Sequence, residues 1–130
     1  RILSSAASDV YKRQVHEGAT KKGDVRNSAS LAAILAVKKT PLSLPHCHPI
    51  PIEGCNVEWQ EVENGLKCVV TVSTTSKTGV EMEALCGVST ALLCAWDMLK
   101  PILKDSSGQY PDTKISDITV ISKLKIPTEN

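Results

Sequence analysis

The feature that most limits how this chain can fold is a long apolar segment in its second half. Residues 78–100 contain no proline, and no charged side chain occurs between Ala84 and Trp96. A helix that is apolar on most of its surface must be covered by other elements of the fold. We therefore predict a deeply buried helix over residues 78–100, which Pro101 should end or kink.

Alternating patterns on both sides of this segment predict the strands that cover it. Apolar residues recur at every second position over 55–60 and again over 66–74, as expected for half-buried strands. Asn64-Gly65 lies between these segments and is typical of a hairpin turn. Residues 114–125 are rich in Ile and Val and are predicted to form a last strand.

A first helix is predicted ahead of these strands. It begins near Asp24, with Asp24, Asn27 or Ser28 as the candidate N-terminal cap, and it ends near Thr40-Pro41. Its apolar face is expected to consist of Leu31, Ala32, Ile34 and Leu35. The order helix, strand, strand, helix, strand predicts an α+β fold, in which helices pack on one face of an antiparallel sheet.

The remaining segments carry weaker patterns. Over residues 1–17, Ser8 can cap a short helix that ends at Gly18, and a loosely ordered terminus is an equal alternative. We expect residues 1–17 to be an atypical segment and residues 18–130 to form one domain, because 130 residues are too few for two ordinary domains. Residues 41–54 hold four prolines and are expected to be an ordered loop or edge segment.

Composition and charge limit which kinds of binding partner and which cellular compartment are expected for this chain. The formal net charge is +1 and no run of five like charges occurs, which disfavours nucleic acid and membrane surfaces as partners. We see no signal peptide and expect no membrane-spanning segment. The five cysteines are odd in number and spread along the chain, so they make a poor disulfide framework and favour a reducing cytoplasm.

One loop contains the residue types of a ligand site. His46-Cys47-His48 lies between Pro45 and Pro49, and imidazole and thiolate are good zinc ligands. Adjacent residues do not easily point at one ion, and His16 is the only other histidine, so we disfavour a metal site. A structural loop is the ordinary interpretation. A rigid loop that presents His48 to a small ligand is the alternative.

Charged residues stand at both ends of the apolar helix. Glu81 and Glu83, with Met82 between them, lie in its first turn, where carboxylates also simply complement the helix dipole. Asp97 and Lys100 lie three residues apart near its end, as a surface ion pair or as an acid–base pair. In the second case, burial is expected to lower the pKa of Lys100.

Two further lysines are candidates for binding an anion. Lys22 precedes Gly23 and the start of the first predicted helix, where backbone N–H groups and the helix dipole favour anions. A solvated charged turn is the alternative. Lys123 lies in the last predicted strand and has the ordinary interpretation of an edge lysine.

Taken in order, four segments resemble the motifs of the MoaC family. They are Lys-Gly-Asp-Val (22–25), Leu-Pro-His-Cys-His-Pro (44–49), Lys-Thr-Gly-Val-Glu-Met-Glu-Ala-Leu (77–85) and Trp-Asp-Met-Leu-Lys (96–100). The resemblance covers roughly residues 18–125. It implies a ferredoxin-like α+β fold and a lyase that converts 3′,8-cyclo-7,8-dihydroguanosine 5′-triphosphate into cyclic pyranopterin monophosphate and pyrophosphate, in molybdenum cofactor biosynthesis.

The same resemblance assigns roles to individual residues. It implies that Asp97, Lys100 and Lys22 are catalytic. The residues that it implies bind the substrate are His46, Cys47, His48, Glu81, Met82, Glu83 and Lys123. It further implies no metal or other cofactor, and a homohexamer assembled from dimers with its sites at subunit interfaces. A non-catalytic oligomeric module of the same fold, which binds a nucleotide or pterin, is the competing interpretation.

Overall fold

The computed structural model describes residues 2–11, 19–20 and 23–127. The elements, in chain order, are β1 (Ile2–Tyr11), β2 (Ala19–Thr20), β3 (Gly23–Asp24), α1 (Val25–Lys38), α2 (Thr40–Ser43), β4 (Gly54–Val62), β5 (Gly65–Thr74), α3 (Glu81–Leu103) and β6 (Lys114–Lys125).

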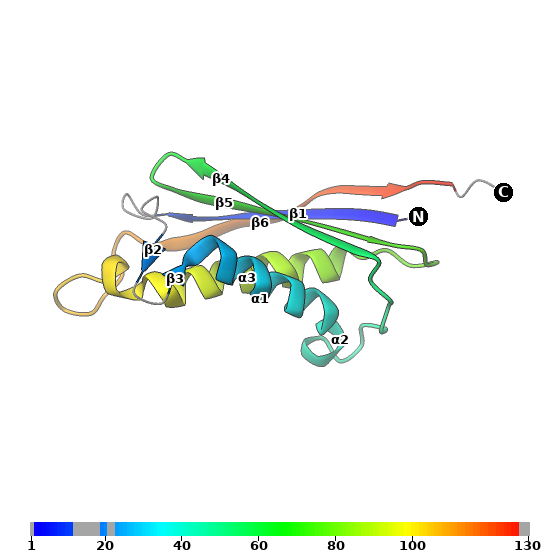
Figure 1. Cartoon of the computed structure of the whole chain (residues 1–130), viewed down its shortest axis with the longest axis horizontal. Coiled ribbons are helices and arrows are strands. Elements are labelled where there is room, and N and C mark those ends of the chain that lie inside the picture. Colours follow the sequence, from blue (N-terminus) through cyan, green and yellow to red (C-terminus); the bar gives the residue numbers. More distant parts are fainter. Residues whose placement is uncertain (1, 12–18, 21–22, 128–130) are drawn as a thin grey trace.

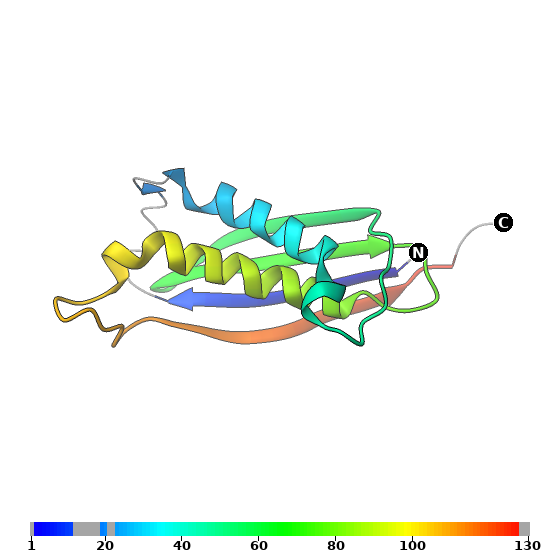
Figure 2. The same cartoon turned by 90° about the horizontal axis from the view of Figure 1, so that it is seen from below.

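One antiparallel sheet forms the main layer of the fold. Its strand order is β4-β5-β1-β6, and a two-stranded ribbon of β2 and β3 stands apart from it. The two long helices α1 and α3 lie side by side on one face of the sheet (Figures 1 and 2). The predicted α+β class is confirmed, and the main-sheet order β-α-β-β-α-β is that of a ferredoxin-like fold.

Residues 2–11 form a strand, which is neither of the two alternatives predicted for them, a short helix or a loosely ordered terminus. β1 lies between β5 and β6, with Ala6 opposite Val70 on one side and Val120 on the other. Pairing along both edges satisfies the backbone of a segment whose own side chains show little periodicity. Ser4 and Ala6 are buried, so small side chains are what this strand presents to the layer of helices above it.

Helix α3 is the buried helix that the apolar segment predicts. It begins at Glu81 and continues through Pro101 to Leu103, so Pro101 does not end it, and a kink at Pro101 stays a prediction. Pro101 removes the one backbone hydrogen bond that its N–H would donate to the carbonyl four residues earlier, and the burial of Leu103 favours the extra turn despite this loss. By length and composition alone α3 also resembles a membrane-spanning helix, but half of that window is buried inside the fold, as in a core helix.

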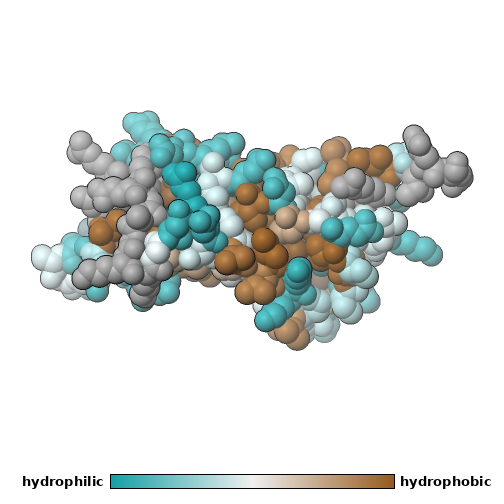
Figure 3. All heavy atoms as spheres, viewed as in Figure 1, coloured by the Kyte–Doolittle hydropathy of each residue, from teal (hydrophilic) through white to brown (hydrophobic). Residues whose placement is uncertain are grey.

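Helix α1 turns a different face to the core from the predicted one. Its buried residues are Val25, Ala29, Ala33 and Val37. By contrast, Leu31 and Leu35 are 63% and 55% exposed. The reason is close helix packing: a Cβ added at Gly87 of α3 would lie 2.7 Å from Val37 Cγ2 and 3.5 Å from the Ala33 carbonyl oxygen. Only small α1 side chains fit there, and Figure 3 shows hydrophobic side chains gathered on the outer surface over α1.

The segments that flank α1 were only partly anticipated. Of the three predicted cap candidates, Asp24 is the one that caps α1, and its side chain accepts a hydrogen bond from the Asn27 N–H at 3.1 Å. The short helix α2 was missed, because three of its four residues fall within the predicted proline-rich loop over 41–54. Pro41 lies in its first turn, where the missing N–H costs nothing, and the Thr40 hydroxyl donates to the Val37 carbonyl at 3.0 Å.

Candidate functional site

A first cluster joins the loop after α2 to the first turn of α3. The Cys47 thiol donates to Glu83 Oε2 at 3.6 Å, and the Glu83 side chain is 2% exposed although it is a carboxylate. His46 and His48 flank the thiol and are exposed. The structure therefore brings the Cys-His loop to the Met-Glu segment, as the proposed site requires.

Burial and charge act on the Cys47 thiol in the same direction. Loss of hydration raises the pKa of Cys47, and the Glu83 carboxylate raises it further through its charge and its hydrogen bond. The thiol is consequently a neutral hydrogen-bond donor near pH 7 rather than a thiolate nucleophile.

This arrangement predicts the reactivity of Cys47. In Glu83→Gln, the pKa of Cys47 should fall while burial still holds it above its ordinary value, so at pH 8 more thiolate is present and alkylation by iodoacetamide should be roughly 3–10-fold faster. The rate is measured on the Cys47 peptide by mass spectrometry. Glu58→Gln, which changes an exposed carboxylate on β4, is the matched control. An unchanged rate in Glu83→Gln would show that burial alone sets the pKa.

Glu81 and Met82 point in other directions from Glu83. Glu81 Oε1 accepts from Lys123 Nζ on β6 at 3.4 Å, and its Oε2 is buried without a hydrogen-bond partner in the described part of the chain. Met82 is 41% exposed and lines a hollow of about 290 Å³ between α1 and α3. Glu81, Glu83, Cys47 and Lys123 thus collect around the start of α3.

A second cluster lies at the other end of α3. Lys100 Nζ and Asp97 Oδ1 are 2.8 Å apart, and their side chains are 46% and 63% exposed. The hydrogen bond and the charge of Asp97 raise the pKa of Lys100, so the expected lowering by burial is wrong for the single chain. Lys22 lies outside the described residues. Its neighbours Gly23 and Asp24 stand where α1 begins, at the same end of the helix pair as the C-terminus of α3 (Figure 2).

The two clusters do not meet within one chain. Fourteen residues separate Glu83 from Asp97 on the same helix. At 1.5 Å of rise per residue, this separation amounts to about 21 Å along the axis. A single small molecule bound at Glu83 therefore does not reach Lys100 of the same chain.

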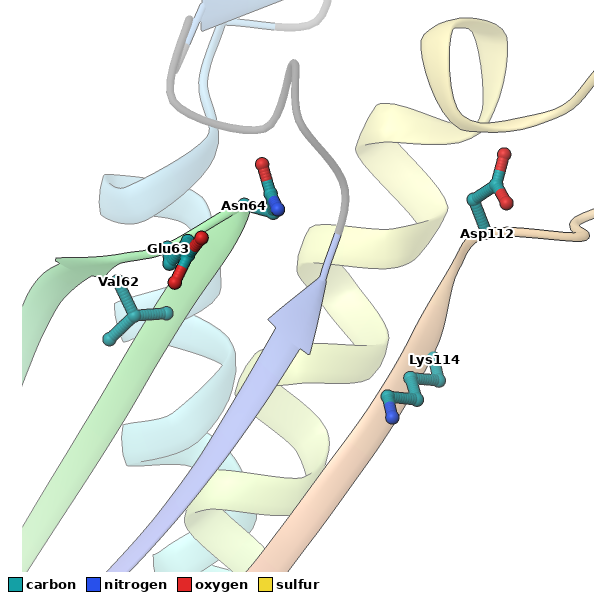
Figure 4. Close-up of a pocket in the computed structure, with 5 residues that line it drawn as sticks. All are labelled: Val62, Glu63, Asn64, Asp112 and Lys114. Atoms are coloured by element: carbon teal, nitrogen blue, oxygen red, sulfur yellow. The ribbon is translucent and has the colours of Figure 1, made fainter.

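Another hollow lies away from the first cluster. Its volume is about 630 Å³, and it opens between the β4–β5 turn and the start of β6, with Val62, Glu63, Asn64, Asp112 and Lys114 around it (Figure 4). No predicted site residue in the described ranges lines it. Across residues 2–11, 19–20 and 23–127, no group of three or more His, Cys, Asp or Glu is arranged to hold a metal ion.

Sequence reasoning missed two lysines close to the first cluster. Lys77 and Lys125 line a hollow of about 220 Å³ together with Lys123 and Gly79. Lys125 lies two residues after Lys123, and side chains two apart on a strand share a face, so the strand period was the available signal.

The domain is ferredoxin-like, and acid–base and cationic side chains lie at both ends of its core helix. These features are typical of an enzyme or binding protein that acts on a small molecule. Comparison with known families makes this class more specific. The MoaC family model matches residues 5–125, so this chain belongs to the MoaC family.

Curated relatives agree with the family assignment. The chain is 53% identical over 125 residues to a "Probable cyclic pyranopterin monophosphate synthase" of Sulfolobus acidocaldarius, covering 96% of this chain and 84% of that protein. A protein of the same description from Methanosarcina mazei is 52% identical over 112 residues, covering 86% and 71%. A third, from Aeropyrum pernix, is 51% identical over 113 residues, covering 87% and 77%.

Proposed function

We propose that this chain is a cyclic pyranopterin monophosphate synthase, a lyase of molybdenum cofactor biosynthesis, and that its active site is built from two copies of the chain. Family membership and the description shared by its relatives support the activity. The substrate is 3′,8-cyclo-7,8-dihydroguanosine 5′-triphosphate, and the products are cyclic pyranopterin monophosphate and pyrophosphate. The five cysteines are all free, which fits the proposed location in a reducing cytoplasm.

The observation that carries the two-copy site is the separation of the clusters along α3. If a second copy packs antiparallel against the outer surface of the helices, Asp97 and Lys100 of one copy approach Cys47 and Glu83 of the other. In a dimer with two-fold symmetry each copy uses the same surface patch, so this approach occurs twice and forms two sites. We propose a homo-oligomer on this basis, and the family resemblance implies that such dimers assemble into a hexamer.

The outer surface of the helices has the character that such packing needs. Large apolar side chains are exposed along it, and a monomer gains nothing from them. These residues are Leu31, Leu35, Leu42, Met82 and Leu93. Their exposure supports a second copy as the cover for this surface.

The residue types suit the proposed reaction. Lys100 beside Asp97 moves protons during the ring rearrangement, while Lys22 and Lys123 offset the negative charge of the triphosphate. His48 and Glu83 hold the pterin or sugar edges. The cyclic phosphate forms when a ribose hydroxyl attacks the α-phosphorus and pyrophosphate leaves, and positioning of the two groups dominates this step.

The direct test is an activity assay on the purified chain. We expect the chain to convert the cyclised GTP intermediate into cyclic pyranopterin monophosphate, measured as its fluorescent oxidation product, with one pyrophosphate released per product. Asp97→Ala is the matched inactive variant. If a folded, oligomeric sample binds the nucleotide without releasing pyrophosphate, the synthase proposal fails and the non-catalytic binding module replaces it.

A further inference from the structure

The lysine-lined hollow beside α3 concentrates positive charge at one point of the fold. Three lysines border it, Lys77 from the segment before α3 and Lys123 and Lys125 from β6. One of these lysines, Lys123, forms an ion pair with the Glu81 carboxylate. In the described part of the chain, Lys77 and Lys125 form no ion pair, which leaves their charges for a ligand.

The backbone around the hollow explains why the lysines converge. Lys123 lies opposite Ser4 in the register of β6 with β1, and Ser4 is buried on the helix side of the sheet. Paired residues on neighbouring strands share a face, so Lys123 points toward the helices, and Lys125 follows two residues later on the same face.

Gly79 allows the hollow to form. A Cβ at Gly79 would overlap the Glu81 carboxylate and would lie 3.4 Å from Lys123 Cε. A side chain at this position would therefore push the Glu81–Lys123 pair out of place. Glycine instead keeps the backbone open next to the lysines.

We propose that Lys77 and Lys125, together with Lys123, bind the β- and γ-phosphates of the substrate, the part that leaves as pyrophosphate. This inference rests on the proposed function and adds two binding residues to it. Lysine binds phosphate as a mobile point charge, and three such charges suit a diphosphate. The hollow of about 220 Å³ is roughly seven times the volume of one water in the liquid, which leaves room for that group.

The location of the hollow agrees with this role. Glu81 contacts the lysine group through Lys123, and Glu83 lies in the same first turn of α3 but on another side of the helix. A substrate whose ring contacts Cys47 and Glu83 therefore extends its phosphates around the start of α3 to reach the hollow.

The test compares Lys77→Gln, Lys125→Gln and the double variant with the unchanged protein. We expect KM for the triphosphate and Ki for added pyrophosphate to rise about tenfold in each single variant and further in the double variant, with little change in kcat, because the lost contacts serve binding. Lys67→Gln is the matched control, because Lys67 lies near the start of β5 whereas Lys77 follows the end of that strand. Unchanged KM and Ki in the double variant would overturn the proposal.

A binding measurement separates this inference from the proposed activity. Inorganic tripolyphosphate should raise the Tm of the unchanged protein and of Lys67→Gln, and should raise it much less for the double variant. If the unchanged protein shows this shift but no turnover, the phosphate site stands and the synthase proposal fails. If the protein turns over substrate and the double variant shows an unchanged tripolyphosphate shift, the phosphate site is wrong and the synthase proposal stands.

Discussion

Replacing Lys100 with alanine is expected to lower kcat by about 10²–10⁴-fold, the usual contribution of a positioned acid–base group. The Asp97 carboxylate raises the pKa of Lys100, so the side chain is a protonated ammonium at neutral pH and acts first as a proton donor. Both side chains are exposed in the single chain, so the substitution leaves no cavity in the core. Formation of cyclic pyranopterin monophosphate and release of pyrophosphate measure the effect.

Two further variants separate proton transfer from charge. Lys100→Arg keeps the positive charge but does not release a proton, so its kcat should remain low. In Asp97→Asn the pKa of Lys100 should fall, because the neighbour that raises it is gone, and the pH at which the ammonium is lost moves down with it. Tm and oligomeric state should match those of the unchanged protein. A kcat within tenfold of normal in Lys100→Ala would contradict the assigned role.

Mixing two inactive variants is expected to restore activity if the site is shared between copies. Lys100→Ala alters one end of α3 and Glu83→Gln alters the other, so neither homo-oligomer has a complete site. After the two are unfolded and refolded together, mixed dimers hold one complete site and one doubly altered site. Random pairing then returns about a quarter of normal activity, since half of the dimers are mixed.

The control for this experiment uses two variants of the same cluster. Lys100→Ala mixed with Asp97→Asn should recover nothing, because each site draws that whole cluster from one chain. Activity that stays at the average of the separate variants in the Lys100→Ala and Glu83→Gln mixture would show that the site is not shared. The product assay measures both mixtures, and size-exclusion chromatography confirms that the refolded samples are oligomeric.

Local sequence patterns were sufficient to predict the elements whose structure depends on short-range signals. The hairpin over 55–74 and the last strand lie where the sequence places them, and the cap of α1 is Asp24, one of the three predicted candidates. Each depends on short-range signals: alternation, a two-residue turn and a capping carboxylate. The motif residues were also located in advance, because a family motif is itself a local pattern.

Long-range packing decided the remainder. β1 is a strand because β5 and β6 supply hydrogen-bond partners on both of its edges, and no residue between 2 and 11 signals those partners. The outward Leu31 and Leu35 follow from the close approach of α1 to Gly87, a contact between segments far apart in the chain.

The sequence by itself determined that this chain has an α+β fold and belongs to one enzyme family, because alternation, caps and motifs act over a few residues. The tertiary structure decided that the motif residues form two clusters at opposite ends of α3. That separation follows from the length of a 23-residue helix, whose rise per residue places its ends too far apart for one small ligand. The lysine-lined hollow likewise exists only because β6 and the start of α3 lie side by side in the folded chain.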